Sequence, residues 1–412
     1  MKIFLFILHL FLLHSMAYGV LVGGRPNAFS GGQNAFAGII NPANAVWVAD
    51  RFDFGTFWVN QKSTLNNRDN NPLFLPGKAD LTYKARNILT VDGAIHKHIE
   101  LKIGKKHFDS SCTLATYTMP SVVKLRTKNP IPISGTTPIR RMSQTNVISL
   151  VFSLRLNASH SIGCSLDYLH FSYLRNGNQN SDTFLRSVSP GHVTNNGCDY
   201  SNGIGLTIGW RWKITKKLDF GTAWSKKSYG GQFRKYRGFE PHHARNYTPQ
   251  LLGAGFSYHF SPKLAGRLEV LWSNLSNLPN ANNNVLANGK PNLHKRGSKK
   301  SPGSGLNDAT FLNMGLGYQV NSMLSIGIGF SHRLRFPRKT SNIISHSYML
   351  QTIYNVLSIG ANFNYQKHEL FLTASYGFKN SVSGWMPKEA GGGRFTGEKQ
   401  TTSISVSWGY KY

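Results

Sequence analysis

Ser201 is the side chain in this sequence whose setting most resembles that of a catalytic nucleophile. It lies in the run Tyr200-Ser201-Asn202-Gly203, and its hydroxyl would need a nearby histidine to accept the proton. The residue two positions before Ser201 is Asp199, and the nearest preceding histidine, His192, is nine residues away. A Ser-Asn-Gly run is more typical of a turn. We therefore predict no catalytic site and no enzyme activity.

The cysteines and carboxylates give no sign of a metal or cofactor site either. The three cysteines, Cys112, Cys164 and Cys198, have neither metal-binding nor redox spacing. The whole chain contains only 17 acidic residues, so there is little material for general acid catalysis. We also find no paired carboxylates and no glycine-rich phosphate loop. We predict that the protein has no metal and no cofactor.

Basic residues are the dominant charge, with 47 Lys and Arg and a formal net charge of +30. A balance of this size commonly indicates nucleic acid or another acidic partner. Here the basic residues are spread over turns and polar strand faces, so we expect no nucleic acid partner. One cluster stands out, the loop run 295–300 (Lys-Arg-Gly-Ser-Lys-Lys). It is either a patch for lipopolysaccharide phosphates or anionic solutes, or an ordinary solvated loop.

The last twelve residues, Thr401 to Tyr412, indicate the type of secondary structure from which the protein is built. Apolar residues alternate with small or polar ones, and the chain ends on an aromatic residue. One face can meet lipid while the other meets a wet lumen, as in the last strand of a transmembrane β-barrel. This pattern predicts an all-β protein of the bacterial outer membrane. No stretch approaches the ~20 apolar residues that a membrane-spanning helix requires.

Amphipathic stretches of this kind recur along the chain, and we predict an antiparallel barrel of about fourteen strands, an even number as closure demands. The connections alternate between short turns and long polar loops, which predicts periplasmic turns and extracellular loops. The fourteen stretches are Arg51 to Lys62, Val91 to Lys105, Leu114 to Arg126, Thr145 to Asn157, Ser161 to Leu174, Gly203 to Ile214, Leu218 to Lys227, Leu251 to Phe260, Leu264 to Leu275, Phe311 to Val320, Met323 to Phe336, Ile353 to Gln366, Glu369 to Lys379 and Thr401 to Tyr412. The predicted long loops are 175–202, 228–248, 276–310, 337–352 and 380–398.

The beginning of the chain divides into two parts before the barrel. Residues 1–19 combine a positive start, an apolar run and a small-residue cleavage pattern ending near Gly19, which predicts a secretory signal peptide. Residues 20–50 are rich in Gly, Ala and Asn, with no charge between Arg25 and Asp50. They are either a disordered leader or a plug folded back into the lumen of the barrel. Residues 51–412 are the predicted barrel.

Several short motifs resemble the FadL/TodX family of outer-membrane transporters for long-chain fatty acids and other hydrophobic compounds. Their order and spacing carry the resemblance over most of the mature chain, although the acidic stretch expected just before the first motif is absent. The motifs are Asn41-Pro42-Ala43 after a small-residue segment, the hairpin 220–227 with 233–238, the strand 252–258 after Pro249, and the stretch 327–332 with Pro337.

This resemblance implies a barrel with a small N-terminal hatch, containing Asn41, Pro42 and Ala43, that takes up hydrophobic or amphiphilic molecules, most of all long-chain fatty acids. Four basic residues on polar strand faces, Arg211, Lys213, Arg267 and Arg333, could offset a carboxylate head group, or could be ordinary lumen wall. The partners implied are outer-membrane lipid and lipopolysaccharide, the hydrophobic substrate, and the barrel assembly machinery, through the strand ending at Tyr412.

Two other functions remain open from the sequence. The basic composition would also suit a porin-like anion channel, although a general porin needs an open lumen rather than an N-terminal plug. A surface adhesin or a structural barrel that transports nothing is equally compatible with the long loops 175–202 and 276–310. Steady ion conductance would distinguish an open channel from a plugged barrel.

Overall fold

The structure is a computed structural model of the 412-residue chain. It describes residues 29–69, 81–126, 129–130, 134–279, 283, 286–287, 290–303, 305–334, 355–385, 388 and 392–412. The predicted signal peptide, residues 1–19, lies outside these ranges, as do residues 20–28 and Pro337.

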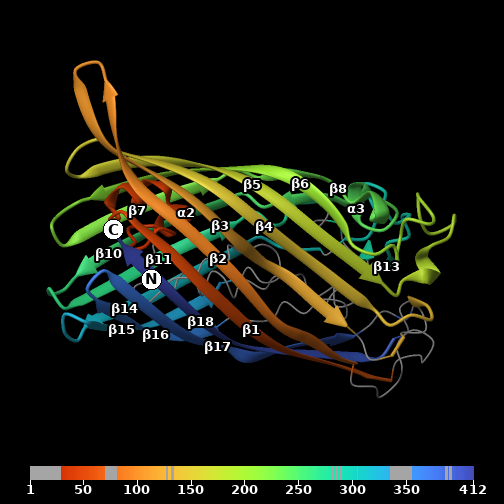
Figure 1. Ribbon diagram of the computed structural model, residues 1–412. Helices are drawn as coiled ribbons and strands as arrows, with labels where there is room; N and C mark the ends of the chain where they lie inside the picture. Colours follow the sequence, from red (N-terminus) through yellow and green to blue (C-terminus); the bar gives the residue numbers. More distant parts are fainter. Residues whose placement is uncertain are drawn as a thin grey trace.

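Strands account for most of the described chain, and fourteen of them form the wall of a barrel (Figure 1). The strands of the wall are Arg51–Arg68 (β1), Leu81–Ile103 (β2), Lys106–Arg126 (β3), Arg140–Arg155 (β4), His160–Asn176 (β5), Asp199–Lys213 (β6), Leu218–Ser225 (β7), Leu251–His259 (β10), Leu264–Ser273 (β11), Ala309–Gln319 (β14), Leu324–Arg333 (β15), Asn355–Tyr365 (β16), His368–Trp385 (β17) and Arg394–Lys411 (β18).

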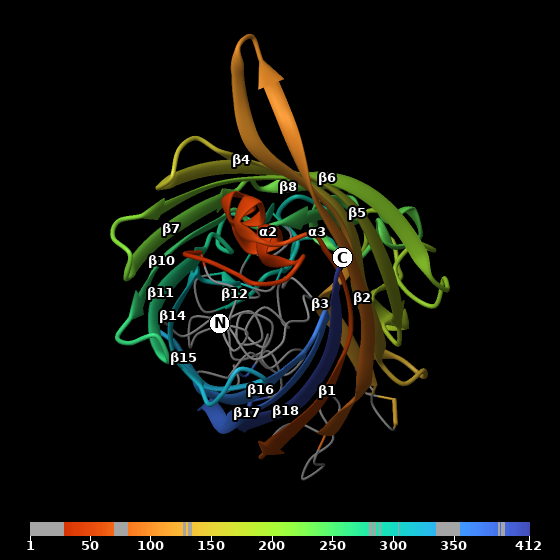
Figure 2. The same cartoon turned by 60° about the vertical axis from the view of Figure 1, so that its left-hand side comes forward.

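The wall closes because the first strand pairs with the last. β1 is antiparallel to β18 from Arg51↔Lys411 to Arg68↔Arg394, and each remaining wall strand pairs with its sequence neighbours in the wall. The main sheet contains sixteen strands, and two of them, Ser228–Gln232 (β8) and Arg245–Thr248 (β9), only extend the lines of β7 and β10. The predicted fold, a closed fourteen-stranded antiparallel barrel, is confirmed (Figure 2).

The distribution of side chains is the reverse of that in a water-soluble domain. On β18, Ile404, Val406 and Trp408 point outward and are exposed, whereas Ser403 and Ser405 point inward and are buried. The same alternation puts Ile208 of β6 on the outside, with 47% of its surface exposed. A continuous apolar outer face of this extent is not stable against water, because soluble monomers expose only small apolar patches. It suits contact with lipid.

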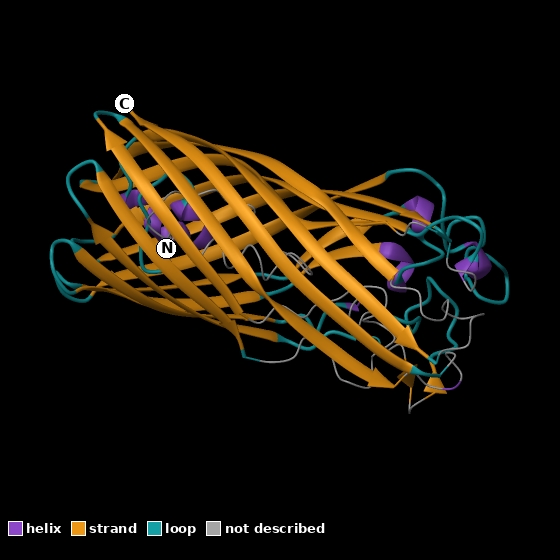
Figure 3. Ribbon diagram, turned by 90° about the horizontal axis from the view of Figure 1, so that it is seen from below, coloured by secondary structure: helices purple, strands orange, loops and turns teal. Residues whose placement is uncertain are grey.

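The two ends of the barrel differ in the length of their connections (Figure 3). One end, the short-turn rim, carries the hairpin turns between β4 and β5, β6 and β7, β10 and β11, β14 and β15, and β16 and β17, together with the C-terminus. The other end, the long-loop rim, carries the helical turns Gln179–Ser181 (η3), Arg234–Tyr236 (η4) and Pro241–Ala244 (α3), and the two-stranded pair Leu286–Ala287 (β12) and Lys290–Pro291 (β13). Among the described residues, none of the helices has the length and apolar character to cross a membrane.

Several strands continue further than the sequence pattern predicted. The prediction of a long loop at 380–398 is wrong, because β17 continues to Trp385 and β18 begins at Arg394. The exposed residues Ser381 and Ser383 are polar there, as are their partners Glu398 and Thr396. The apolar outer face that marks a lipid-facing strand therefore disappears, while the hydrogen-bonded ladder continues. β8 and β9 likewise extend into the predicted loop 228–248.

The long loops pack on one another around a buried carboxylate at the long-loop rim. The Tyr173 hydroxyl donates to Oε1 of Glu240 at 2.8 Å, and the guanidinium groups of Arg175 and Arg141 lie 3.7 and 3.8 Å from the same oxygen. Burial opposes ionisation of Glu240, but the two arginines outweigh it and hold the pKa of Glu240 below its ordinary value. This cluster ties the loop after β8 to the ends of β4 and β5.

The outward position of Ile208 gives a test of the register. Replacing Ile208 by Arg should lower the free energy of unfolding in lipid vesicles by roughly 2–4 kcal/mol, because it puts a charge on the lipid face. Ser322→Arg, in the exposed turn between β14 and β15, is the control and should change little. The measurement is reversible denaturant unfolding in vesicles. An Ile208→Arg protein as stable as the control would reverse the assignment of the two faces.

Candidate functional site in the barrel lumen

The N-terminal segment Phe29–Val48, called here the lumenal segment, lies inside the barrel near the short-turn rim (Figure 2). It contains one helical turn, Ala37–Ile40 (α2), and a 3₁₀ helix, Pro42–Trp47 (η1). Nearly all of its residues are buried, and η1 packs against β3, β4, β5 and β6. Because the segment is uncharged and made of small or apolar residues, it can fill the lumen without burying unpaired charges.

The motif Asn41-Pro42-Ala43 forms the start of η1 and fixes it to the wall. The Asn41 side chain accepts from the backbone N–H of Ala43 at 3.1 Å, as a helix N-cap does. Pro42 occupies the first helical position, where its missing N–H costs nothing. The Asn41 amide also donates to the carbonyl oxygens of Phe29 at 2.6 Å and Trp210 at 3.0 Å. The motif therefore joins the first residue of the lumenal segment and the start of η1 to β6.

Glycines of the wall let the lumenal segment approach the strands at backbone distance. A Cβ atom at Gly209 would lie 1.9 Å from Oδ1 of Asn41, and one at Gly163 would lie 2.5 Å from the carbonyl carbon of Pro42. At Gly221 a Cβ would be 1.7 Å from the carbonyl oxygen of Phe29. Any larger residue at these positions displaces the segment or the strand. These inward-facing glycines, Gly163, Gly209 and Gly221, lie under the segment and are called here the glycine track.

The beginning of the lumenal segment is held by β10 and β11. The backbone N–H of Phe29 donates to the Glu269 carboxylate at 3.0 Å, and the hydroxyls of Ser30 and Ser257 are 2.7 Å apart. The ring of Phe29 covers Gly253, where a Cβ would lie 1.9 Å from its tip. Further along, the Ser161 hydroxyl of β5 donates to the Ala43 carbonyl at 2.7 Å. The segment is thus fixed to several strands of the wall, from β5 to β11.

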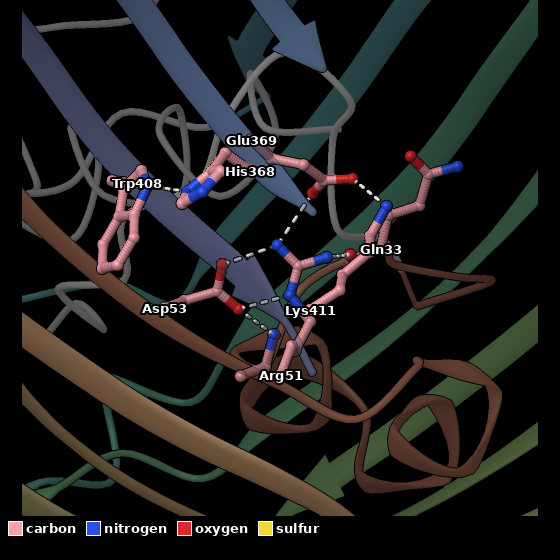
Figure 4. Close-up of polar contacts among 8 residues, drawn as sticks. Gln33, Arg51, Asp53, His368, Glu369, Trp408 and Lys411 are labelled. Carbon is pink, nitrogen blue, oxygen red and sulfur yellow. Dashed lines mark hydrogen bonds and ion pairs between the residues drawn. The ribbon is translucent and has the colours of Figure 1, made fainter. Parts of the chain in front are cut away.

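A buried ion-pair cluster holds the middle of the lumenal segment (Figure 4). Arg51 binds Asp53 with two hydrogen bonds of 2.7 Å and also donates to Glu369 at 2.7 Å. A third nitrogen of Arg51 donates to the Gln33 carbonyl, and Asp53 accepts from the backbone N–H of Ala35 at 2.7 Å. Lys411 pairs with Glu369 from the other side. Only 1% of Arg51 is exposed, so these contacts replace its water shell.

The sequence analysis did not identify this cluster or the glycine track. Arg51 and Asp53 are two residues apart on one face of the first strand, and this was the available signal for the cluster. Glu369 and Lys411 are more than 300 residues away from Arg51, and only closure of the barrel brings them to it. Inward-facing glycines look like ordinary strand glycines until the segment that covers them is known.

All four proposed lumenal cations face the interior, but they do not converge on one point. Arg211 and Lys213 lie beside η1, with their charged groups 5.3 and 3.6 Å from the ring centre of Trp47, and Arg211 is 3.4 Å from Asp219. Arg267 is on β11, and Arg333 lies over the Phe311 ring on the far side of the wall, 5.4 Å from its centre. The first two therefore contact the lumenal segment itself.

Apolar side chains are interspersed with polar ones on the inward face of the wall. The buried inward-facing apolar side chains of the wall strands include Phe57, Val59, Leu169, Phe171, Leu251, Leu271, Phe311, Val356 and Phe371. Beside the lumenal segment at the short-turn rim lies a polar cavity of about 780 Å³, whose lining includes Gln33, Arg51, Lys263, Glu369 and Lys411. The interior thus combines large apolar side chains on a mixed wall with a charged mouth at this end.

The other candidate groups do not assemble into a reactive site. The Ser201 hydroxyl accepts from the Asn246 amide at 2.8 Å, and no histidine hydrogen-bonds to it within the described part of the chain. The three cysteines are free thiols. Asp50, His96 and His98 bring their possible metal-binding atoms within 4.8 Å of one another. Both ring nitrogens of His96 are already hydrogen-bonded, to Thr113 and to the Val48 carbonyl, which indicates a structural role.

Comparison with known proteins gives a likeness in structure rather than in sequence. No protein-family model matches the chain, and no curated protein matches it in sequence. The toluene transporter TodX of P. putida is 11% identical with a TM-score of 0.62, covering 93% of this chain and 95% of that one. A FadL homologue of Pseudomonas aeruginosa is 13% identical with a TM-score of 0.62, covering 96% and 99%. The toluene transporter TbuX of Ralstonia pickettii is 10% identical with a TM-score of 0.60, covering 95% and 96%. The chain has the barrel fold of these transporters, so the fold that the resemblance implied is confirmed.

The glycine track predicts how the lumenal segment can be displaced. Gly209→Val should push Asn41 off the wall, because even a Cβ at this position overlaps its side chain. The expected result is a higher ion conductance in planar bilayers than that of the unmodified protein. Gly317→Val is the matched control, since Gly317 also faces inward and a Cβ there would have its nearest neighbour 4.0 Å away. Equal conductance of the two variants would mean that the segment does not block the lumen.

The buried ion-pair cluster should be a large contributor to stability. Asp53→Ala leaves Arg51 with one buried partner fewer and removes the acceptor of Ala35, so the free energy of unfolding should fall by about 3–5 kcal/mol. Lys379→Ala breaks an ion pair with Glu398 in which the Lys379 side chain is 59% exposed. It should lower the free energy of unfolding by less than about 1 kcal/mol. Denaturant unfolding of both variants measures the difference. Similar losses would show that the cluster is not a special anchor.

Proposed function

We propose that this protein lies in the bacterial outer membrane and carries hydrophobic or amphiphilic small molecules through a plugged barrel, with long-chain fatty acids as the first candidate substrate. The short-turn rim faces the periplasm and the long-loop rim faces the exterior. The observation that carries the proposal is the combination of large apolar side chains in the lumen with a lumenal segment held by β11 on one side and by β1 on the other. The solved barrels of the same fold include proteins described as toluene transporters.

The chemistry of the interior supports a substrate with an apolar chain and a small polar end. The apolar side chains of the lumen offer burial for a hydrocarbon chain, at about 0.8 kcal/mol per methylene. In the charged mouth beside the lumenal segment, Arg51 and Lys411 are engaged by Asp53 and Glu369, and Lys263 is the cation proposed for an anionic head group. In this proposal Arg211, Lys213, Arg267 and Arg333 add positive potential along the lumen.

In this proposal the lumenal segment, with the hatch motif Asn41-Pro42-Ala43, closes the path in the resting protein. Opening a passage would require Phe29–Val48 to release its hydrogen bonds to the wall and its contacts with the wall glycines, while the strand pairing of the barrel stays intact. The barrel assembly machinery is the proposed partner during insertion, recognising the C-terminal strand β18 and its terminal Tyr412. A binding role for lipopolysaccharide at the loop run 295–300 also belongs to this proposal.

A porin-like anion channel is the second candidate function, because the formal net charge of +30 and the inward-facing cations favour it. The two functions differ in what the unmodified protein does in a planar bilayer. A plugged transporter should pass few ions at rest, whereas an open channel should conduct steadily and select anions over cations.

Chain length of the ligand gives a direct test of the proposed substrate class. Shortening a bound fatty acid by four carbons should weaken binding to the purified protein by ~3 kcal/mol, because four methylenes lose their burial. Replacing the carboxylate by an alcohol should weaken binding less. The measurement is titration of a fluorescent long-chain fatty acid with competition by shorter acids and by the alcohol. Affinity that is independent of chain length would overturn the proposal and favour the anion channel or a barrel with no transport role.

A further inference from the structure

One part of the barrel wall leaves the barrel. β1 pairs with β2 only as far as His96, and β4 begins to pair with β3 at Ser110. Between these points the chain pairs only with itself, from Lys97↔Cys112 to Ile103↔Lys106. Residues 97–109, called here the free ribbon, are therefore a two-stranded ribbon with no wall strand on either side.

The free ribbon extends sideways from the short-turn rim. In Figures 1 and 2 it is the orange hairpin, and in both views it rises across the barrel axis rather than along it. Its tip is the two-residue turn Gly104-Lys105, where Gly104 takes a φ of +60° that suits glycine. Each arm has about seven residues at ~3.3 Å, so the ribbon reaches roughly 20 Å from the wall. A ribbon in this direction runs parallel to the plane of a membrane that surrounds the barrel.

An isolated two-stranded ribbon is marginally stable in water, and one face of this ribbon continues the lipid-facing surface of the wall. Ile95 and Leu114, at its base, point outward and are 49% and 50% exposed. Following the same face outward along the ribbon, Ile99 is 42% exposed, and Leu101 lies opposite Phe108. The apolar outer surface of the barrel therefore continues onto the ribbon, with one lysine, Lys97, between Ile95 and Ile99 on that face.

The tip and both faces of the ribbon carry basic side chains. Lys97, Lys102, Lys105 and Lys106 are all exposed. The two acidic residues of the ribbon already have partners. Glu100 pairs with His107 within the ribbon, and Asp109 lies 2.9 Å from Arg155 and 3.8 Å from His98. The acids are thus compensated locally, and the lysines give the ribbon a net positive surface. Lysines beside an apolar face are typical of polypeptide that lies at a membrane interface.

We infer that the free ribbon lies on the periplasmic surface of the outer membrane, with Ile99, Leu101 and Phe108 against the lipid and its lysines bound to the phosphates of anionic phospholipids. This inference rests on the proposed location in the outer membrane. Continuity with the lipid-facing wall and charge complementarity with phosphate both favour lipid as the occupant. The ribbon would fix the depth and tilt of the barrel at its periplasmic rim, since it is a lateral arm on one side.

Fluorescence quenching in vesicles tests the inference with the full-length protein. Cys112, Cys164 and Cys198 are first replaced by Ser, and a single new thiol, Leu101→Cys, carries an environment-sensitive dye. The protein is reconstituted in phosphatidylcholine vesicles that contain phosphatidylglycerol and a lipid with a spin label on its head group. We expect quenching of the dye and a blue shift of its emission. A second probe at Ile208→Cys, quenched by lipids labelled on the acyl chain, reports insertion of the barrel itself.

The charge requirement has its own variant and control. Lys102→Glu, Lys105→Glu and Lys106→Glu together should reduce quenching at the Leu101→Cys probe, because the equilibrium constant for binding of the ribbon to the surface should fall at least roughly fivefold for each lysine changed. Lys216→Glu with Lys217→Glu, in the short turn between β6 and β7, is the matched control and should leave it unchanged. Heat-modifiable migration on gels verifies that each variant is folded.

The two probes separate failure of the inference from failure of the proposed function. Quenching at Ile208→Cys without quenching at Leu101→Cys would place the ribbon in the periplasm, free or bound to a protein. That result would overturn the inference and leave the proposed function intact. Loss of quenching at Ile208→Cys would overturn the membrane location and the inference with it. Quenching at Leu101→Cys that is the same with and without phosphatidylglycerol would overturn the role of the lysines.

Discussion

Close packing of the lumenal segment against glycines of the wall is the constraint on which the rest of this structure depends. Asn41, Pro42 and Phe29 lie at distances from Gly209, Gly163 and Gly221 that no Cβ atom could tolerate. Such contacts require that each of these glycines face inward, and a slip of one residue in any strand would turn it outward. The register of β5, β6 and β7 therefore depends on the position of the segment, and the position of the segment depends on that register.

The ion-pair cluster around Arg51 links the position of the lumenal segment to closure of the barrel. Arg51 and Asp53 belong to the first strand of the wall, while Glu369 and Lys411 belong to the last two. The same cluster holds the backbone at Gln33 and Ala35. Buried charges are tolerated only when they are paired, so an open barrel or a displaced segment would leave some of these groups without partners. Closure and plugging consequently stabilise each other.

The two ends of the barrel meet different surroundings and are built differently. At the long-loop rim, the Glu240 cluster and the packed loops form a cap whose backbone is tied to β4 and β5. At the short-turn rim, tight hairpins leave the lumen mouth lined by charged groups, and the free ribbon is the one connection of that rim that continues outward. The lipid-facing band between the ends requires only alternation of apolar residues, and this explains why identities of 10–13% with other barrels suffice for the same fold.

The sequence by itself determined the class of fold, because lipid on one side and water or packed polypeptide on the other impose a period of two on every strand. Fourteen amphipathic stretches, the last of them ending at Tyr412, were enough to predict a closed antiparallel barrel. Strand ends were predicted less well, since the pattern fades at Ser381 and Ser383 while backbone pairing continues.

Only the tertiary structure decided which inward residues matter. Arg51 meets Glu369 through closure, the glycine track exists only under the lumenal segment, and the free ribbon is recognised only where β1 and β4 stop pairing. Each of these depends on contacts between residues far apart in sequence, for which local spacing carries no signal.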